Sequence, residues 1–214
     1  MTQPIFRLFK LSLNLAYEAD YEKVGFTNLT RSVAGESGTL AMFSNHVAGD
    51  KTQQVVLELY VDETSYQAHV TSEHFKAFAN LAGKALTNRE IINLEPQTLL
   101  KKAGSLRVVE KNDLFIRLAH VLVSDSQSFA DIVLPEMKNS MAVEDGVLLM
   151  FAGTDINIPC SWYFYEIYAN QAAYDSHCQT EHFKDYIART IDLVVEKNLK
   201  VLTGDVLVSK ADLS

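Results

Sequence analysis

The sequence repeats itself once, with an offset of about half its length. Residues 58–76 read ELYVDETSYQAHVTSEHFK, and residues 166–184 read EIYANQAAYDSHCQTEHFK, 108 positions later. Eight of the 19 aligned positions are identical without a gap, including the final run Glu-His-Phe-Lys in both copies. Because self-similarity at an offset of domain size indicates a duplicated unit, we expect two similar modules within the 214 residues.

The two halves show the same order of expected elements. In the first half, apolar alternation and turn residues predict strands at residues 6–15, 39–43, 54–61 and 94–101. Between these strands we expect helices capped by Asp20, Asp62 and Ser72, of which the second ends at His69 and the third spans about 73–86.

In the second half, the same signals predict strands at residues 115–123, 147–151, 161–169 and 199–208. Helices are expected from Ser126 onward, over 171–177 and over 181–196. Pro135 lies within the first of these helices. Because proline lacks an amide N–H and its ring clashes with the preceding turn, we expect this helix to kink or to end early.

The element order βαββαβ in each half is that of the ferredoxin-like split motif, so the predicted fold class is α+β. We place repeat 1 at residues 1–104 and repeat 2 at residues 113–214, with the charged segment between them as connector. Such a sheet carries its helices on one face. Because the strand at 54–61 is apolar on both faces, we expect the two sheets to pack on each other as an intramolecular dimeric barrel. The chain would then be a monomer with pseudo-two-fold symmetry or a homodimer of such chains.

The charge balance limits the classes of partner. Nineteen basic against 27 acidic residues give a net charge of −8, which argues against nucleic acid and against an anionic membrane surface, because both need clustered Lys and Arg. No apolar run approaches the roughly 18 residues of a membrane span, and no leader-like segment opens the chain. Cys160 and Cys178 have no metal or redox spacing, so we expect reduced thiols and a cytoplasmic location.

Four of the repeated residues are histidines at opposite helix ends. His69 and His177 close a short helix, where the negative end of the helix dipole favours imidazolium. His74 and His182 lie in the first turn of the next helix, where the dipole favours the neutral ring. Since opposed pKa shifts commonly separate an acid from a base, we expect His74 and His182 as catalytic bases, with His69 and His177 as proton donors or orienting groups. The alternative is that all four are capping or packing residues.

Carboxyl and aromatic side chains of the same block are the expected substrate-binding residues. Glu58 and Tyr60 share a strand face, and Glu166 and Tyr168 share the equivalent face. If that face meets the helices, carboxylate, phenol and imidazole converge on one pocket in each half. The aromatic residues that complete this expected set are Tyr66, Tyr174 and Trp162. Each of these side chains is equally suited to a core position.

A metal site is a weaker alternative. His69 and Glu73 are four residues apart, as on one helical turn, and the second copy has the same spacing. However, Ser72 has the character of a cap, which would interrupt the helix between them. Because no third ligand follows from the spacing, we expect no metal. The sequence also lacks glycine-rich nucleotide loops, so we expect no cofactor.

The chain resembles the antibiotic biosynthesis monooxygenase family in a tandem, two-domain form. The resemblance rests on the pattern Glu-x-Trp/Tyr, a helix containing His, and Ser/Thr-x-His-Phe, which occurs over residues 58–75 and again over 166–183. It implies a barrel of ferredoxin-like subunits. Members similar to this sequence include cofactor-independent oxygenases of quinols and polycyclic aromatics, isomerases of small signalling sugars, and haem-degrading proteins. This sequence departs from the pattern at Tyr60 and Tyr168, where many oxygenases carry Trp, and in having Glu before His-Phe instead of a frequent Pro.

The resemblance and the histidines together lead to a hypothesis about function. We expect a cofactor-independent monooxygenase that oxidises a small aromatic or quinol-type substrate with O2 after a histidine takes the substrate proton. One alternative is a non-oxidative isomerase of a small polar substrate, which a pocket lined by Arg7, Lys10 or Arg117 would favour because phosphate needs cations. Another is a ligand-binding or stress-response module without turnover.

Overall fold

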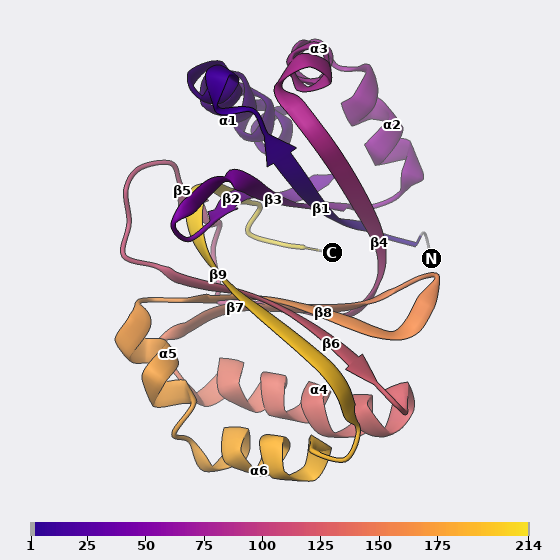
Figure 1. Ribbon diagram of the computed structural model, residues 1–214, viewed down its shortest axis with the longest axis vertical. Helices are drawn as coiled ribbons and strands as arrows, with labels where there is room; N and C mark the ends of the chain where they lie inside the picture. Colours follow the sequence, from indigo (N-terminus) through magenta and orange to yellow (C-terminus); the bar gives the residue numbers. More distant parts are fainter. Residues whose placement is uncertain (1–2, 214) are drawn as a thin grey trace. The chain divides into compact units, whose positions relative to one another are not determined.

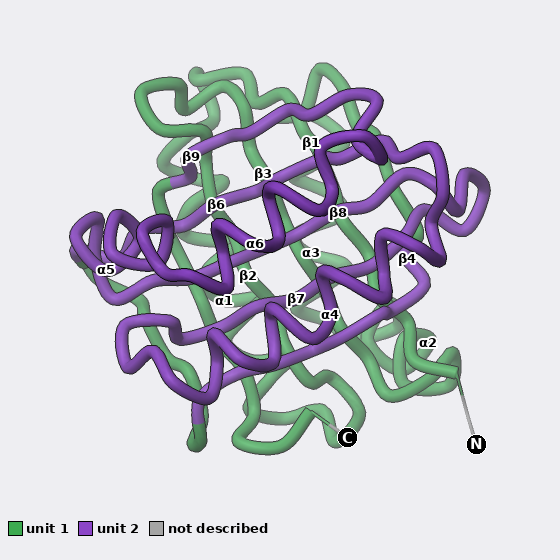
Figure 2. The backbone as a smooth tube through the Cα atoms, turned by 90° about the horizontal axis from the view of Figure 1, so that it is seen from below, with its two compact units in different colours: residues 1–93, 103–112, 203–214 green, residues 94–102, 113–202 purple. Residues whose placement is uncertain are grey.

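The chain folds into two compact units (Figure 2), and the computed structural model describes residues 3–213 of it. Unit 1 contains residues 1–93, 103–112 and 203–214, and unit 2 contains residues 94–102 and 113–202. Each unit is an antiparallel sheet with helices on one face (Figure 1), so the predicted α+β class with two ferredoxin-like repeats is confirmed. The outermost residues of the two expected repeats, 1–2 and 214, lie outside the described part of the chain.

Unit 1 contains the elements of one repeat. They are β1 (Ile5–Leu13), a single 3-10 turn (Leu15–Tyr17), α1 (Glu18–Gly35), β2 (Thr39–Val47), β3 (Asp50–Tyr60), α2 (Glu63–Thr71), α3 (Glu73–Ala85) and the first part of β4 (Leu86–Lys101). Strand β3 runs antiparallel to both β1 and β2, and β4 is the other neighbour of β1. The sheet and its helices thus form two layers.

Unit 2 repeats this order. Its elements are β6 (Phe115–Val123), α4 (Ser126–Val143), β7 (Val147–Asp155), β8 (Ile158–Tyr168), α5 (Gln171–His177), α6 (Glu181–Thr190) and the first part of β9 (Val194–Ser209). Arg7 lies opposite Glu58 across β1 and β3, and Arg117 lies opposite Glu166 across β6 and β8. The first strands of the repeats are therefore related by an offset of 117 − 7 = 110 residues, whereas Glu58 and Glu166 keep the offset of 108.

The last strand of each repeat contributes to both units. From Leu94 onward β4 pairs with β7, so that Leu99 lies opposite Phe151. The end of β9 belongs to unit 1, where it pairs with β5 (Arg107–Val108) and with β2. The compact units differ in this respect from contiguous repeats at 1–104 and 113–214, because β4 and β9 are each 16 residues long and the two ends of each strand belong to different units.

Side-chain caps fix the starts of five helices, α2 to α6, with Asp125 as the cap of α4. Asp62 accepts a backbone N–H at the start of α2 at 2.8 Å, and Ser72 accepts one at the start of α3 at 3.2 Å, as predicted. Asn170 and Thr180 do the same in unit 2. The expected cap at Asp20 is wrong, because α1 begins two residues earlier and this carboxylate lies within its first turn. A carboxylate there still interacts favourably with the positive end of the helix dipole.

Helix α4 does not end at Pro135. The helix continues through the proline to Val143, so the expected early end is wrong. Val133 and Met137, on either side of the proline, are buried in the core of unit 2. This packing offsets the single backbone hydrogen bond that a proline removes.

The core of each unit lies between its sheet and its helices. In unit 2, Trp162 and Phe164 of β8 pack against Phe129 of α4. In unit 1, a smaller cluster joins Leu29 of α1 to Tyr60 of β3. None of the helices within residues 3–213 combines the length and the apolar character that crossing a membrane requires.

Candidate functional site

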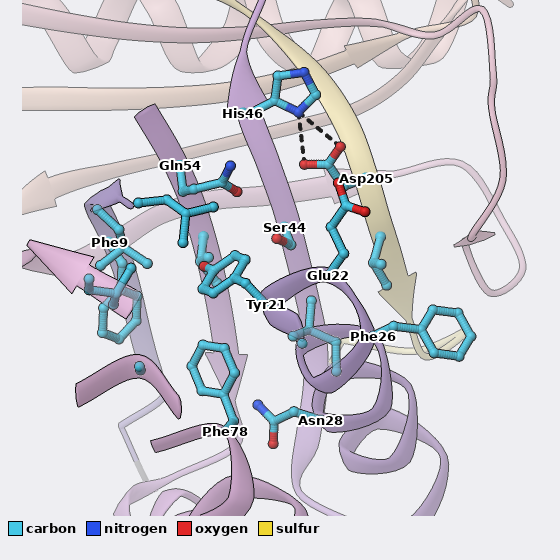
Figure 3. Close-up of a pocket in the computed structure, with 18 of the residues that line it drawn as sticks. Phe9, Tyr21, Glu22, Phe26, Asn28, Ser44, His46, Gln54, Phe78 and Asp205 are labelled. Atoms are coloured by element: carbon cyan, nitrogen blue, oxygen red, sulfur yellow. Dashed lines mark hydrogen bonds and ion pairs between the residues drawn. The ribbon is translucent and has the colours of Figure 1, made fainter. Parts of the chain in front are cut away.

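A cavity of about 1100 Å³ lies within unit 1, between the sheet and helices α1 and α3 (Figure 3). Its apolar wall includes Phe9 of β1, Val56 of β3, Phe26 of α1 and Phe78 of α3. Figure 3 shows Tyr21 and Phe78 extending from their helices into the space in front of the strands, and their ring centroids are 5.7 Å apart. A concave site of this size, mostly apolar with a few convergent polar groups, is typical of small-molecule binding.

Three buried polar atoms in the cavity wall lack a hydrogen-bond partner among the described residues. They are the hydroxyl oxygen of Tyr21, Oδ1 of Asn28 and Nε of Arg7. Tyr21 and Asn28 are only 4% and 2% exposed. An unpaired buried donor or acceptor costs roughly 1–3 kcal/mol, so a molecule in the cavity that hydrogen-bonds with these atoms would remove this cost. Burial raises the pKa of the Tyr21 phenol, and the negative charges of Asp205 and Glu58 add to this effect, so the phenol stays a neutral donor.

Glu58 on β3 provides a carboxyl group in the cavity wall. The hydroxyl of Tyr60 donates to its Oε2 at 2.9 Å. Burial raises the pKa of Glu58 to about 7, although the Tyr60 hydrogen bond and the positive charge of Arg7 act in the opposite direction. A carboxyl group with a pKa near neutrality can take up and return a proton at physiological pH, as general acid–base catalysis requires.

Cationic side chains stand next to this carboxyl group. The guanidinium of Arg7 lies 4.0 Å from the centroid of the Tyr66 ring, in stacking contact. Arg89 of β4 also lines the cavity, and its positive charge acts on Glu58. The cavity therefore combines a largely apolar lining with one carboxyl group and two arginine side chains.

A histidine–aspartate pair lies at the same cavity. His46 of β2 donates from Nδ1 to Oδ1 of Asp205 at 2.9 Å (Figure 3), and both residues line the cavity. The two residues are 159 positions apart in the sequence and meet because the end of β9 enters unit 1. No sequence pattern indicates this pair, since neither residue belongs to the repeated block.

The predicted catalytic histidines of unit 1 bind a shared carboxylate. Nδ1 of His69 lies 3.2 Å from Oε2 of Glu36, and Nε2 of His74 lies 2.7 Å from Oε1. Hydrogen bonds from Thr39 and both histidines lower the pKa of Glu36 despite its burial. His69 is completely buried, and neither histidine is among the residues that line the cavity.

Unit 2 contains the same arrangement. Nδ1 of His177 and Nε2 of His182 lie 3.0 Å and 2.7 Å from Oε1 of Glu144. Their hydrogen bonds lower the pKa of Glu144, although burial opposes this. Glu144 is related to Glu36 by the 108-residue offset. Glu36 follows α1 and binds histidines of α2 and α3, and Glu144 follows α4 and binds histidines of α5 and α6. A catalytic role for the four histidines stays a prediction.

The expected charge state of His69 is wrong. Burial lowers the pKa of His69, and this effect outweighs the charge and hydrogen bond of Glu36. The helix dipole, on which the expectation depended, is a smaller influence than complete desolvation of the ring. Nε2 of this ring is buried without a partner among the described residues.

Two groups of side chains have donor atoms close enough to hold a metal ion. Within each group the donor atoms lie within 4.8 Å of one another: Glu36, His69 and His74 in unit 1, and Glu136, His177 and His182 in unit 2. In unit 1 the imidazoles already bind the glutamate of the group. In unit 2 they bind Glu144 instead, and Oε1 of Glu136 accepts a hydrogen bond from Ser140 at 2.7 Å. The pairing of His69 with Glu73 is not formed, because Glu73 is exposed and binds Lys76 at 2.9 Å.

The predicted substrate-binding residues of unit 1 lie in and behind the cavity wall. Glu58 and Tyr66 line the cavity, whereas Tyr60 is completely buried and supports Glu58. Tyr21 and Asn28 are not among the site residues predicted from the sequence. Neither lies in the repeated block, and a single polar residue on an amphipathic helix gives no signal of its own.

The corresponding residues of unit 2 are in contact with one another. The hydroxyl of Tyr168 donates to Oε2 of Glu166 at 2.9 Å. Arg117 lies over the ring of Tyr174, 4.6 Å from its centroid. Trp162 is 1% exposed within the aromatic core.

The fold and the cavity define a tandem ferredoxin-like protein with a partly open cavity in unit 1. The family model for antibiotic biosynthesis monooxygenase matches residues 4–81 and 124–189, so the chain belongs to this family, with a copy of the domain in each half. No curated protein matches the chain.

Solved structures agree with this assignment. A candidate monooxygenase from Lactobacillus acidophilus NCFM is 31% identical, with 97% of this chain and 96% of that chain covered and a TM-score of 0.87. A candidate monooxygenase from Fusobacterium nucleatum is 22% identical, with 98% and 95% covered and a TM-score of 0.89. An anthrone oxidase-like protein shares the fold at 11% identity, with 99% and 95% covered and a TM-score of 0.64.

Proposed function

We propose that the unit 1 cavity binds a small phenol or quinol and oxidises it with O2 without a metal or organic cofactor. The observation that carries this proposal is the carboxyl group of Glu58, which has a pKa of about 7 and lies in the wall of a largely apolar cavity. Membership of the monooxygenase family supports the reaction class. That the substrate is a small phenol or quinol is also proposed.

The proposed reaction begins with proton transfer. Ionised Glu58 takes the phenolic proton, and the guanidinium of Arg7 stabilises the phenolate that forms. The electron-rich phenolate passes one electron to O2, and the resulting radical pair forms a C–O bond. Loss of water from the hydroperoxide leaves a carbonyl, so that a quinol and O2 give a hydroxyquinone and H2O. The four electrons lost by the substrate are those that reduce O2.

Glu58 is proposed as the base because of its position. It lines the cavity, whereas His74 lies outside the wall with Nε2 bonded to Glu36 at 2.7 Å. The neutral hydroxyl of Tyr21, which lacks a partner among the described residues, is placed to donate to a carbonyl or phenolic oxygen of the ligand.

Oxygen uptake by the purified, metal-free protein with a panel of quinols and anthrones tests the proposal. Glu58→Gln removes the base and is expected to lower the rate at least 100-fold. Glu90→Gln is the matched control, because this glutamate of the same sheet binds Lys10 at the exposed surface, 3.5 Å away. Absence of enzyme-dependent uptake, or equal rates for both variants, would contradict the proposal.

The guanidinium groups favour a second candidate function. Arg7 and Arg89 both line the cavity, and a pair of cations suits a phosphorylated or carboxylated ligand. A non-oxidative isomerisation of such a compound, with Glu58 moving the proton, would consume no oxygen. Proton exchange at a carbon atom of sugar phosphates, followed by NMR in D2O, separates this candidate from the oxidation.

A further inference from the structure

We infer that each chain binds one ligand, in unit 1, and that the equivalent space in unit 2 is filled by the protein's own aromatic rings. The inference rests on the proposed function only for the location of the site. It concerns how many sites a chain has and which residues decide this.

Four aromatic residues of unit 2 take the positions of cavity-lining residues in unit 1. At the 108-residue offset, Tyr21, Gln54, Val56 and Phe78 of unit 1 correspond to Phe129, Trp162, Phe164 and Tyr186 of unit 2. Trp162 and Phe164 are the decisive replacements, because each puts a ring where unit 1 has a smaller, non-aromatic side chain.

The rings of unit 2 bridge its sheet and its helices. The centroid of Phe129 on α4 lies 5.3 Å from that of Trp162 and 6.2 Å from that of Phe164, both on β8. It also lies 6.2 Å from the ring of Tyr186 on α6. Aromatic pairs at 4.5–7 Å are in direct packing contact. Phe129, Trp162 and Phe164 are 0%, 1% and 4% exposed, so these rings occupy the layer in which unit 1 has its cavity.

Two of the three unpaired polar atoms in the cavity wall of unit 1 are removed or paired in unit 2. The hydroxyl of Tyr21 has no counterpart, because Phe129 stands in its place. Asn28 corresponds to Glu136, whose Oε1 accepts a hydrogen bond from Ser140 at 2.7 Å. The hydroxyl oxygen of Tyr21 and Oδ1 of Asn28, which have no hydrogen-bond partner among the described residues of unit 1, therefore have no unpaired counterpart in unit 2. Nε of Arg117 remains without a partner among the described residues, as does that of Arg7.

The residues that recur in both halves do not distinguish them. Tyr60 donates to Glu58 at 2.9 Å, and Tyr168 donates to Glu166 at the same distance. The tyrosine–glutamate pair is present in unit 2 although aromatic rings fill the interior of that unit. We therefore assign the pair a structural role in both units. A binding site needs the open volume as well, which Gln54 and Val56 leave in unit 1.

A binding titration of the full chain tests the inference. The probe is anthraquinone-2-sulfonate, a planar aromatic that is already oxidised, and isothermal titration calorimetry gives the number of sites per chain. We expect one site. The double variant Gln54→Trp/Val56→Phe, which copies unit 2 into unit 1, is expected to lower the affinity at least tenfold. Tyr21→Phe, a much smaller change that removes only the unpaired hydroxyl, is expected to lower it about fivefold.

The control is Arg189→Gln, a change in unit 2 at an exposed residue that pairs with Asp185 at 3.2 Å, and it is expected to keep the stoichiometry and the affinity. Thermal unfolding of every variant shows whether it is folded. Two sites per chain, no binding to the wild type, or full affinity in Gln54→Trp/Val56→Phe and in Tyr21→Phe would overturn the inference. If one probe molecule binds per chain but no substrate consumes oxygen, the proposed oxidation fails and the single site stands.

Discussion

The hydroxyl of Tyr60 donates a hydrogen bond of 2.9 Å to Oε2 of Glu58, the carboxyl group proposed as base. This bond lowers the pKa of Glu58, against the larger effect of burial. Tyr60→Phe removes the donor and is therefore expected to raise the pKa of Glu58 above about 7. A 13C NMR titration of the glutamate carboxyl groups measures this, with Glu58→Gln assigning the signal. Tyr168→Phe in unit 2 is the control, and an unchanged pKa in Tyr60→Phe would contradict the expectation.

Replacing Glu58 should change how stability depends on pH. Its pKa is raised in the folded state from 4.5 to about 7, so the folded state holds this proton more tightly than the unfolded state does. The contribution of Glu58 to stability therefore falls as the pH rises from about 4.5 to about 7.

Glu58→Gln removes that penalty. The variant is expected to be as stable as the wild type near pH 5 and more stable at pH 8, by at most roughly 3 kcal/mol. Urea unfolding at both values of pH measures the difference. A variant that is less stable than the wild type at pH 8 would show that ionised Glu58 is not penalised by burial.

Glu36 should stabilise unit 1 through its two histidines. Glu36→Gln removes the charge that His69 and His74 bind, and at pH 7 the loss is expected to be roughly 1–3 kcal/mol. The pKa of Glu36 is lowered in the folded state, so its stabilisation is present above its unfolded value of 4.5 and disappears as the pH falls below it. Unfolding free energies from pH 7 down to acid check the sign. Glu90→Gln should show no such dependence.

Replacing His74 tests whether this residue has a structural or a catalytic role. If Glu58 is the base, His74→Gln lowers stability but keeps the oxygen-uptake rate of the folded protein within about twofold. If His74 is the base, the rate falls by the 10²–10⁴ typical of general base catalysis. Comparing the rate with the folded fraction, from circular dichroism of the same sample, distinguishes the two outcomes.

Gly146 should be required for packing against α5. A Cβ atom added at Gly146 would lie 2.6 Å from Cβ of Ala173, which is closer than carbon atoms can approach. Gly146→Ala is expected to cost roughly 1–3 kcal/mol, and Ala173→Gly in the same chain should restore part of it. Gly35→Ala is the control, because nothing lies within 4 Å of its Cβ position. Denaturant unfolding of the wild type and the three variants measures the free energies of unfolding. If the double variant is no more stable than Gly146→Ala, a clash with Ala173 is not the cause of the loss.

The repeat predicted the architecture well because helix caps and strand patterns depend on residues that are neighbours in the sequence. The caps at Asp62 and Ser72 and the strand at 115–123 depend on neighbouring residues and on apolar alternation, and the structure confirms them. The cap at Asp20 was wrong because α1 already begins at Glu18. The end at Pro135 was wrong because α4 continues to Val143, with Val133 and Met137 buried on either side of the proline.

The sequence alone determined that the chain has two ferredoxin-like repeats and that Glu58 and Glu166 stand on equivalent strands. Only the tertiary structure decided where a ligand has room. His46 and Asp205 meet because two distant strands come together in unit 1, and the cavity is open because Gln54 and Val56 project no ring into it. Residues that recur in both halves are those that the fold requires in each repeat. A cavity depends instead on small side chains contributed by several elements that are distant in the sequence.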